Sequence, residues 1–232
     1  MKKIALAGLL FAAANANTNS SGFFLGLSGG ILIGTKTYGG AMEKNQMVLP
    51  STTSVGWNVG VDAGYKQAFS DLNGLKYYIS YNYGASYGKG AGGDNNVIQV
   101  NANIQETLLV ANIDYYHHLS KSLSAYVGVG LGYQAVNPIW KVADNNLFSA
   151  SNFAIGGSGQ GGLALPINVG VNYDFNQKHS LSLGAKLPVL SLDYRLKNVP
   201  TGYDVKTNAT TSGDGSVKFR GYIVQISYHY KF

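Results

Sequence analysis

The chain has 232 residues, with 31 glycines, 17 tyrosines, no cysteine and a charged fraction of only 12%. Low charge combined with many aromatic residues excludes a disordered chain, and the lack of cysteine excludes a disulfide-stapled domain. No apolar run reaches the roughly 18 residues that a membrane helix requires. What remains is a Gly- and Tyr-rich chain of single-domain length.

Residues 1–16 have the organisation of a secretory signal peptide. Two lysines are followed by an apolar stretch, and Ala14 and Ala16 supply the small side chains that precede a cleavage site. We predict cleavage after Ala16, so that Asn17 begins the mature chain and residues 17–232 form one domain. Removing the two lysines leaves 15 basic against 11 acidic residues, a net charge of +4. This charge is too small and too scattered to indicate nucleic-acid binding.

Apolar and polar residues alternate through most of the mature chain, which is the period of a β-strand. In the segment 54–66, odd positions from Val55 to Tyr65 are apolar, whereas even positions are Gly, Ser, Asn, Asp62 and Lys66. Seven further segments alternate with varying clarity: 23–37, 75–83, 107–115, 123–133, 165–175, 181–189 and 222–232. Runs of this length fit tilted strands that cross a bilayer, which need about 9–11 residues.

The connections between these segments alternate in length. The long ones are 38–53, 84–106, 134–163 and 190–220, and the short ones are 67–74, 116–122 and 176–180. All long connections therefore emerge on one side, as in bacterial outer-membrane barrels. We predict an all-β protein: an eight-stranded antiparallel transmembrane β-barrel with short periplasmic turns and four long external loops. Ten strands stay possible if a long loop contains a hairpin, and a soluble barrel is disfavoured because it would expose charge rather than apolar side chains.

Two prolines and many aromatic residues have predicted places in this barrel. Pro166 and Pro188 each lack a ladder donor and suit strand ends or bulges. Aromatic residues should form a girdle at each membrane interface. The periplasmic set is Phe23, Phe24, Tyr65, Tyr77, Tyr115, Tyr173, Phe175, Tyr228, Tyr230 and Phe232, and the external set is Tyr38, Trp57, Tyr83, Tyr133, Tyr194 and Tyr222.

Scarce charged residues occupy the polar face of the predicted strands and should point into the lumen. They are Asp62, Lys66, Lys76, Glu106, Asp114, Asp174 and Lys186, with Lys231 in the last strand. A buried charge must be paired or hydrated, and eight strands enclose only enough room for side chains. We therefore expect a salt-bridged plug, with a narrow polar pore as the alternative.

Signals for catalysis or cofactor binding are weak. The G-x-G-x-x-G pattern at residues 157–162 lacks a strand-then-helix context, so we interpret it as a flexible loop that enters the sixth strand. His117 lies near Asp114 and Ser120, but three polar residues at a turn are usually just solvated. The chain shows no metal-ligand spacing. We expect no catalytic residue, no cofactor and no metal.

The C-terminal strand resembles the signal that the outer-membrane assembly machinery recognises. Its alternate apolar or aromatic positions are Tyr222, Val224, Ile226, Tyr228, Tyr230 and Phe232. An exposed strand of this kind can pair with the sheet edge of a receptor. Residues 179–188 followed by Asp193-Tyr194 are similar to the penultimate strand of the Helicobacter outer-membrane protein (Hop/Hor) paralogues, and residues 222–232 resemble their last strand.

This resemblance implies an outer-membrane barrel, and members of the family act as pores or as adhesins toward host glycans. The chain lacks the cysteine-containing insertion of the large adhesins, so it best matches a small barrel-only member. We predict a non-enzymatic surface protein of the bacterial outer membrane with a structural or adhesion-type role. A small porin is the first alternative, and a lipid-modifying enzyme is the second. Expected partners are outer-membrane lipid and lipopolysaccharide, the assembly machinery and an external ligand, and we expect a monomer.

Overall fold

A computed structural model describes residues 20–44, 51–92, 98–142, 160–204 and 209–232, so the predicted signal peptide lies outside the described residues. The elements are β1 (Gly22–Gly40), α2 (Ala41–Lys44), β2 (Thr53–Ala68), β3 (Asn73–Gly92), β4 (Ile98–His118), β5 (Leu123–Val142), β6 (Gln160–Ala164), β7 (Pro166–Asp174), β8 (His179–Pro188), β9 (Leu192–Asp204) and β10 (Ala209–Lys231). No helix in the described part of the chain has the length and apolarity needed to cross a membrane.

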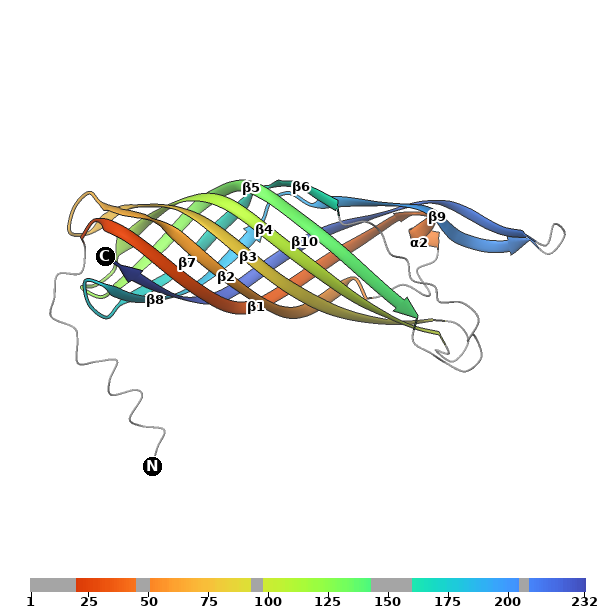
Figure 1. Ribbon diagram of the computed structural model, residues 1–232, viewed down its shortest axis with the longest axis horizontal. Helices are drawn as coiled ribbons and strands as arrows, with labels where there is room; N and C mark the ends of the chain where they lie inside the picture. The colour runs from red at the N-terminus through yellow and green to blue at the C-terminus, as the bar shows by residue number, and fades with distance from the viewer. Residues whose placement is uncertain (1–19, 45–50, 93–97, 143–159, 205–208) are drawn as a thin grey trace, which may run out of the picture.

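The strands close into a barrel (Figure 1). Each neighbouring pair is antiparallel, and β1 pairs with both β2 and β10, so the first and last strands complete the ring. Both β6 and β7 pair with β5, and both β8 and β9 pair with β10, so each couple forms one interrupted strand. The ring therefore contains eight strands, as the sequence predicts, and the extra strands come from two interruptions.

The two prolines lie at these interruptions. Pro166 begins β7, Pro188 ends β8, and the two residues face each other across the ladder. Proline removes a ladder donor, so both prolines occupy strand ends rather than strand interiors. Beyond the proline pair, the backbone nitrogen of Val189 still donates to Leu165 O at 3.0 Å. Further out, the Gln160 side chain bridges the gap by bonding both the backbone oxygen and the backbone nitrogen of Arg195.

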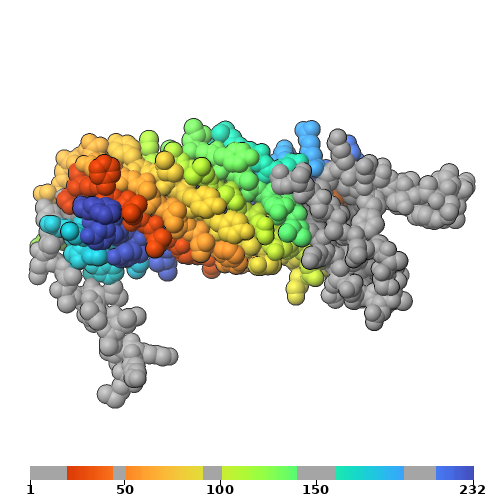
Figure 2. Space-filling view, in the orientation of Figure 1, coloured from red at the N-terminus to blue at the C-terminus, as the bar shows by residue number. Residues whose placement is uncertain are grey.

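Each strand has an apolar outward face and a polar or small inward face. On β2, Val59 and Val61 are about half exposed at 50% and 49%, whereas their neighbours Asn58 and Asp62 are only 2% and 5% exposed. Because side chains alternate along a strand, a slip of one residue would turn Asp62 outward. Figure 2 shows the wall on this side as a continuous surface of side chains from β1 to β5.

The strands extend well past the predicted boundaries. β3 and β5 have 20 residues each and β10 has 23, so much of the sequence expected as loops 84–106, 134–163 and 190–220 is strand. A strand of about 20 residues, at ~3.3 Å per residue and a tilt of ~40°, rises about 50 Å, roughly twice the apolar band of an outer membrane. The outer half of the barrel thus stands above the bilayer, and the β9–β10 hairpin projects farthest (Figure 1).

Three aromatic residues predicted for the interfacial girdles instead point inward. Phe24, Tyr38 and Tyr194 are buried at 6%, 9% and 3% exposure. Each of the three lies an even number of residues from the inward-facing residues of its own strand, so the alternation of the strand turns it inward. This alternation outweighs the general preference of aromatic side chains for the interface. Outward aromatic residues remain at both predicted heights, for example Tyr77 and Tyr115 near the short turns and Trp57 and Tyr133 farther out.

At Gly30, the absence of a side chain lets the backbone of β1 lie close to the backbone of β10. A Cβ atom at this position would lie 2.1 Å from the backbone oxygen of Val224, and backbone cannot move aside as a flexible side chain can. The adjacent Gly29 faces outward, and a Cβ there would meet nothing within 4 Å. Small size on the inward face is therefore a packing requirement of the narrow ring.

Candidate functional site

The middle of the lumen is filled by a polar network centred on Lys186. Its Nζ donates to Ser80 Oγ at 3.3 Å, Asn168 Oδ1 at 3.4 Å and Asn112 Oδ1 at 3.5 Å. The same ammonium lies 5.5 Å from the centre of the Tyr78 ring, and the Tyr78 hydroxyl donates to Asp114 Oδ2 at 2.7 Å. The network therefore ties together β3, β4, β7 and β8 across the barrel.

A second charged layer lies nearer the short turns. Lys66 Nζ is 3.7 Å from Asp174 Oδ2, and Asn172 Nδ2 donates to Asp174 Oδ1 at 2.7 Å. Asp62 Oδ2 lies 3.5 Å from His229 Nε2. These pairs and the Lys186 network fill the polar half of the lumen with side chains that hold one another.

The structure places the eight predicted lumen charges on the inward face. Six are 6% exposed or less, namely Asp62, Lys66, Glu106, Asp114, Asp174 and Lys186, and Lys76 and Lys231 are half-buried. It brings Lys66 and Asp174 together as an ion pair. Glu106 stands apart: its Oε2 has no hydrogen-bond partner in the described part of the chain, and it lies over Gly221, where a Cβ would come within 1.9 Å of it.

The outer half of the lumen is mainly apolar, with the buried polar side chains of Lys36, Glu106 and Gln134 set among the apolar ones. Three buried clusters follow one another outward along the strands. They comprise Leu32, Leu108, Val110, Ala164 and Ile223, then Ile104, Val136, Leu192 and Phe219, then Tyr38, Ala41, Met42, Ala102, Tyr194 and Val217. Two cavities beside these clusters measure only about 10 Å³ each, about the space of a single water. This apolar filling is absent from the sequence prediction, which treated the lumen as uniformly small and polar.

The structure does not bring Asp114, His117 and Ser120 together as a triad. Asp114 is buried inside the barrel, whereas His117 and Ser120 are exposed. Residues three apart on a strand point to opposite faces, so Asp114 and His117 cannot act together. Within the described ranges, no group of three His, Cys, Asp or Glu residues could hold a metal ion. The glycine-rich pattern at 157–162 lies partly outside the described residues, and its last three residues belong to strand β6 rather than to a loop.

The C-terminal strand presents its alternate side chains on the outer surface. Val224, Ile226 and Tyr228 are exposed at 40%, 55% and 41%, and Phe232 is exposed at 67%. The Phe232 backbone nitrogen donates to Phe23 O at 2.9 Å, so the last residue seals the closing ladder. The rings of Tyr230 and Phe232 lie 5.1 Å apart at the periplasmic end.

An apolar outer wall, a closed ring of long tilted strands and short turns at one end define an outer-membrane β-barrel, because a ring of this kind leaves no open edge in hydrocarbon. Residues 60–232 match the Helicobacter outer membrane protein family, and the chain belongs to this family. The protein is therefore a component of the bacterial outer membrane, as the sequence predicts.

Solved structures of other outer-membrane barrels share this fold. The chain is similar to the outer membrane protein OprG from Pseudomonas aeruginosa, with 15% identity over 94% of this chain and 100% of that chain and a TM-score of 0.50. It is also similar to Neisserial surface protein A (12%, 92% and 100%, TM-score 0.48) and to the outer membrane protease OmpT from Escherichia coli (9%, 93% and 99%, TM-score 0.46). At 15% identity the likeness to OprG shows the fold alone. A search of curated proteins gave no match.

Several uncharged residues of the lumen were not singled out from the sequence, although Asn112 and Asn168 lie on the polar face of the predicted strands 107–115 and 165–175. Asn112 and Asn168 connect Lys186 to Asp114, and Tyr78 faces the same ammonium, yet none of them carries charge. Their inward parity was the available signal, because the same alternation that places Asp114 inside also places Asn112 inside. The apolar residues Val217 and Phe219 were missed because the last strand was predicted to begin at Tyr222.

Proposed function

We propose that this protein is a non-enzymatic barrel that presents its outer extension to partners outside the cell, in a structural or adhesion-type role. The observation that carries the proposal is the contrast between the two ends of the molecule. The lumen is filled by a polar network and three apolar clusters, while the β9–β10 hairpin projects beyond the rest of the barrel. Exposed segments on a rigid scaffold are where binding residues concentrate.

The projecting hairpin also has an unpaired edge. Along the described chain, the outer part of β9 pairs only with β10, so its other edge offers free backbone groups. Such an edge can pair with a strand from another chain. The outward apolar side chains support contact with outer-membrane lipid and lipopolysaccharide, and the exposed last strand supports recognition by the assembly machinery.

Shortening the hairpin tests this role. Leu196 pairs with Gly215, so replacing residues 197–214 by Asn-Gly joins these two residues through a two-residue turn. Bacteria with this variant should keep a heat-modifiable, surface-exposed barrel but lose attachment to cultured epithelial cells. If a strain lacking the protein shows normal envelope integrity and unchanged attachment, both the structural and the adhesion-type roles fail.

The polar inner half of the lumen favours one alternative, a small porin. Conduction would require a path past the apolar clusters around Leu108 and Phe219, and the adjoining cavities are only about 10 Å³. We expect purified protein in planar bilayers to show no conductance above the lipid background. Stepwise openings would favour the porin and would argue against a filled lumen.

A further inference from the structure

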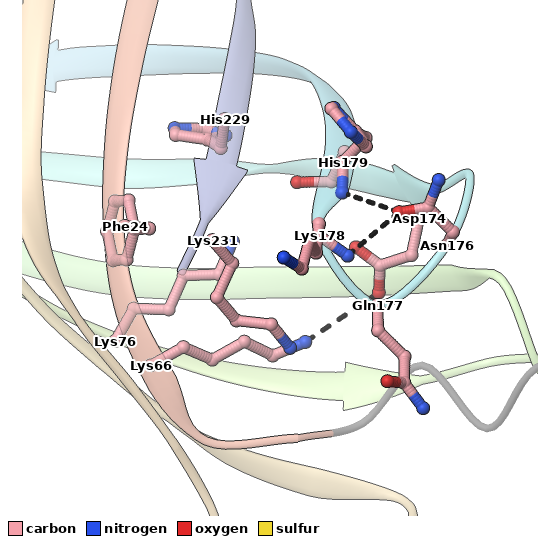
Figure 3. Close-up of a pocket in the computed structure, with 11 residues that line it drawn as sticks. Phe24, Lys66, Lys76, Asp174, Asn176, Gln177, Lys178, His179, His229 and Lys231 are labelled. Carbon is pink, nitrogen blue, oxygen red and sulfur yellow. Dashed lines mark hydrogen bonds and ion pairs between the residues drawn. The ribbon is translucent and has the colours of Figure 1, made fainter.

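The periplasmic mouth of the barrel collects lysines from four separate elements. Lys66 comes from the end of β2, Lys76 from the start of β3, Lys178 from the turn after β7 and Lys231 from the end of β10. Figure 3 shows their side chains around one cavity, with His229 and Phe24 on its wall. The cavity measures about 30 Å³, room for about two waters. We name it the mouth pocket.

Positive charge in the mouth pocket exceeds negative charge. Asp174 is the one carboxylate among the described residues that line it, and it pairs with Lys66 at 3.7 Å. No carboxylate of the described residues lies within ion-pair distance of Lys76, Lys178 or Lys231. Lys231 Nζ instead donates to the backbone oxygen of Ser20 at 2.9 Å, and Lys76 Nζ lies 5.7 Å from the Tyr126 ring centre.

The turn that carries Lys178 is held in place. Asn176 Oδ1 accepts hydrogen bonds from the backbone nitrogens of Lys178 at 2.8 Å and His179 at 2.9 Å (Figure 3). The backbone nitrogen of Lys231 donates to Lys178 O at 2.7 Å, which fixes the turn to the last strand. The basic groups therefore converge on a pre-formed pocket, and a ligand would lose little affinity to ordering the turn.

Four lysines around one lining carboxylate favour a small, multiply charged anion, and this excess of positive charge remains after Asp62 and Asp114, which lie outside the pocket lining and also attract Lys76, are counted. Lys76 and Lys231 both repel Lys66 electrostatically, so a bound anion would relieve repulsion as well as pair charge. A phosphate monoester carries about −1.5 to −2 charges at pH 7, against one for a carboxylate, and lysine is an established phosphate ligand. We propose that the mouth pocket binds a phosphate group from the periplasmic side, supplied either by a lipid headgroup or by a soluble phosphate.

Calorimetry on the refolded mature chain in non-ionic detergent tests the proposal, with inorganic phosphate as the probe. The wild type should give one saturable site for phosphate. Acetate should bind at least about tenfold more weakly than phosphate, which is the effect of losing one charge-assisted hydrogen bond. The double variant Lys76→Gln, Lys178→Gln should weaken phosphate binding by about tenfold or more. The single variant Lys178→Gln should fold normally, because Lys178 is exposed in a turn. A weaker phosphate affinity in this variant therefore cannot be attributed to misfolding, and we expect such a loss.

Lys121→Gln is the matched control, since it removes a lysine from another periplasmic turn outside the mouth pocket. Its phosphate affinity should equal that of the wild type. The proposal is overturned if the wild type shows no saturable binding, if Lys121→Gln loses as much affinity as Lys178→Gln, or if acetate binds as tightly as phosphate. Repeating the titration in phosphatidylcholine vesicles with added phosphatidate identifies the source: competition supports a lipid headgroup, and its absence supports a soluble phosphate.

Discussion

Replacing Lys186 by methionine tests whether the polar network holds the barrel together. Methionine keeps much of the side-chain volume but removes the ammonium that bonds Ser80, Asn112 and Asn168. Two of these acceptors retain other partners, because Asn112 Nδ2 donates to Ser80 Oγ and Asn168 Nδ2 donates to Asn112 Oδ1, both at 2.9 Å. Asn168 Oδ1 is the acceptor that is left without a donor.

The expected loss follows mainly from charge. Asp62 and Asp114 attract the Lys186 ammonium from beyond ion-pair distance, and losing a hydrogen bond to a charged group costs about 1.5–3 kcal/mol. A desolvated cation over an aromatic ring contributes about 2 kcal/mol. The same substitution removes this contribution, so it is part of the expected loss and is not added to it. We therefore expect Lys186→Met to lower the free energy of unfolding by about 1.5–3 kcal/mol.

Urea-dependent unfolding and refolding in lipid vesicles, followed by tryptophan fluorescence and heat-modifiable migration, measures this loss. Leu187→Met is the matched control, because the neighbouring side chain faces outward and methionine preserves its volume; it should change stability by less than about 1.5 kcal/mol. A loss below about 1 kcal/mol for Lys186→Met would mean that the hydrogen bonds of the Lys186 ammonium contribute little to stability, and the reasoning above would be refuted.

Three further predictions follow from facing, packing and closure. Val59→Arg places a charge in the lipid-facing band and should cost about 2–4 kcal/mol, whereas Asn58→Ser should cost under about 1 kcal/mol; equal losses in vesicle unfolding would contradict the facing. Gly30→Ala forces a Cβ against backbone and should cost about 1–3 kcal/mol, while Gly29→Ala should be nearly neutral, and a neutral result at both sites in the same assay would refute the packing argument. Deleting Phe232 should reduce assembled barrel in outer-membrane fractions, and wild-type levels would argue against its role as part of the assembly signal.

Strand facing was predictable from sequence because it depends only on local alternation. Asp62 and Lys66 share parity with the glycines of β2, and the structure buries both. The ring of eight strands was also predictable, because the sequence contains eight alternating segments that are joined in turn by long and short connections. Parity alone also separates Asp114 from His117, because residues three apart on a strand point to opposite faces, which agrees with the rejection of a triad on sequence grounds.

Features above the membrane were not predictable in this way. Outside the bilayer no hydrocarbon requires an apolar outer face, so the outer part of β10 alternates in the opposite sense: Val217 and Phe219 point inward, whereas Lys218 and Arg220 are exposed. Phe219 and Leu192 pack together only because the register of β10 shifts by two residues between β8 and β9. The mouth pocket was equally hidden, because Lys76 and Lys178 are far apart in sequence and meet only when the ring closes.

The proline interruption makes the barrel wall unequal in strength around its circumference. The ladder between β1 and β10, which joins the two ends of the chain, contains 17 residue pairs, whereas the ladder between β7 and β8 contains nine. Opening the outer half of the wall therefore breaks the fewest backbone hydrogen bonds beside Pro166, not at the junction of first and last strands. Amide hydrogen exchange should begin there, around Leu165 and Val189, so the barrel unzips along an internal line while its terminal strands stay joined.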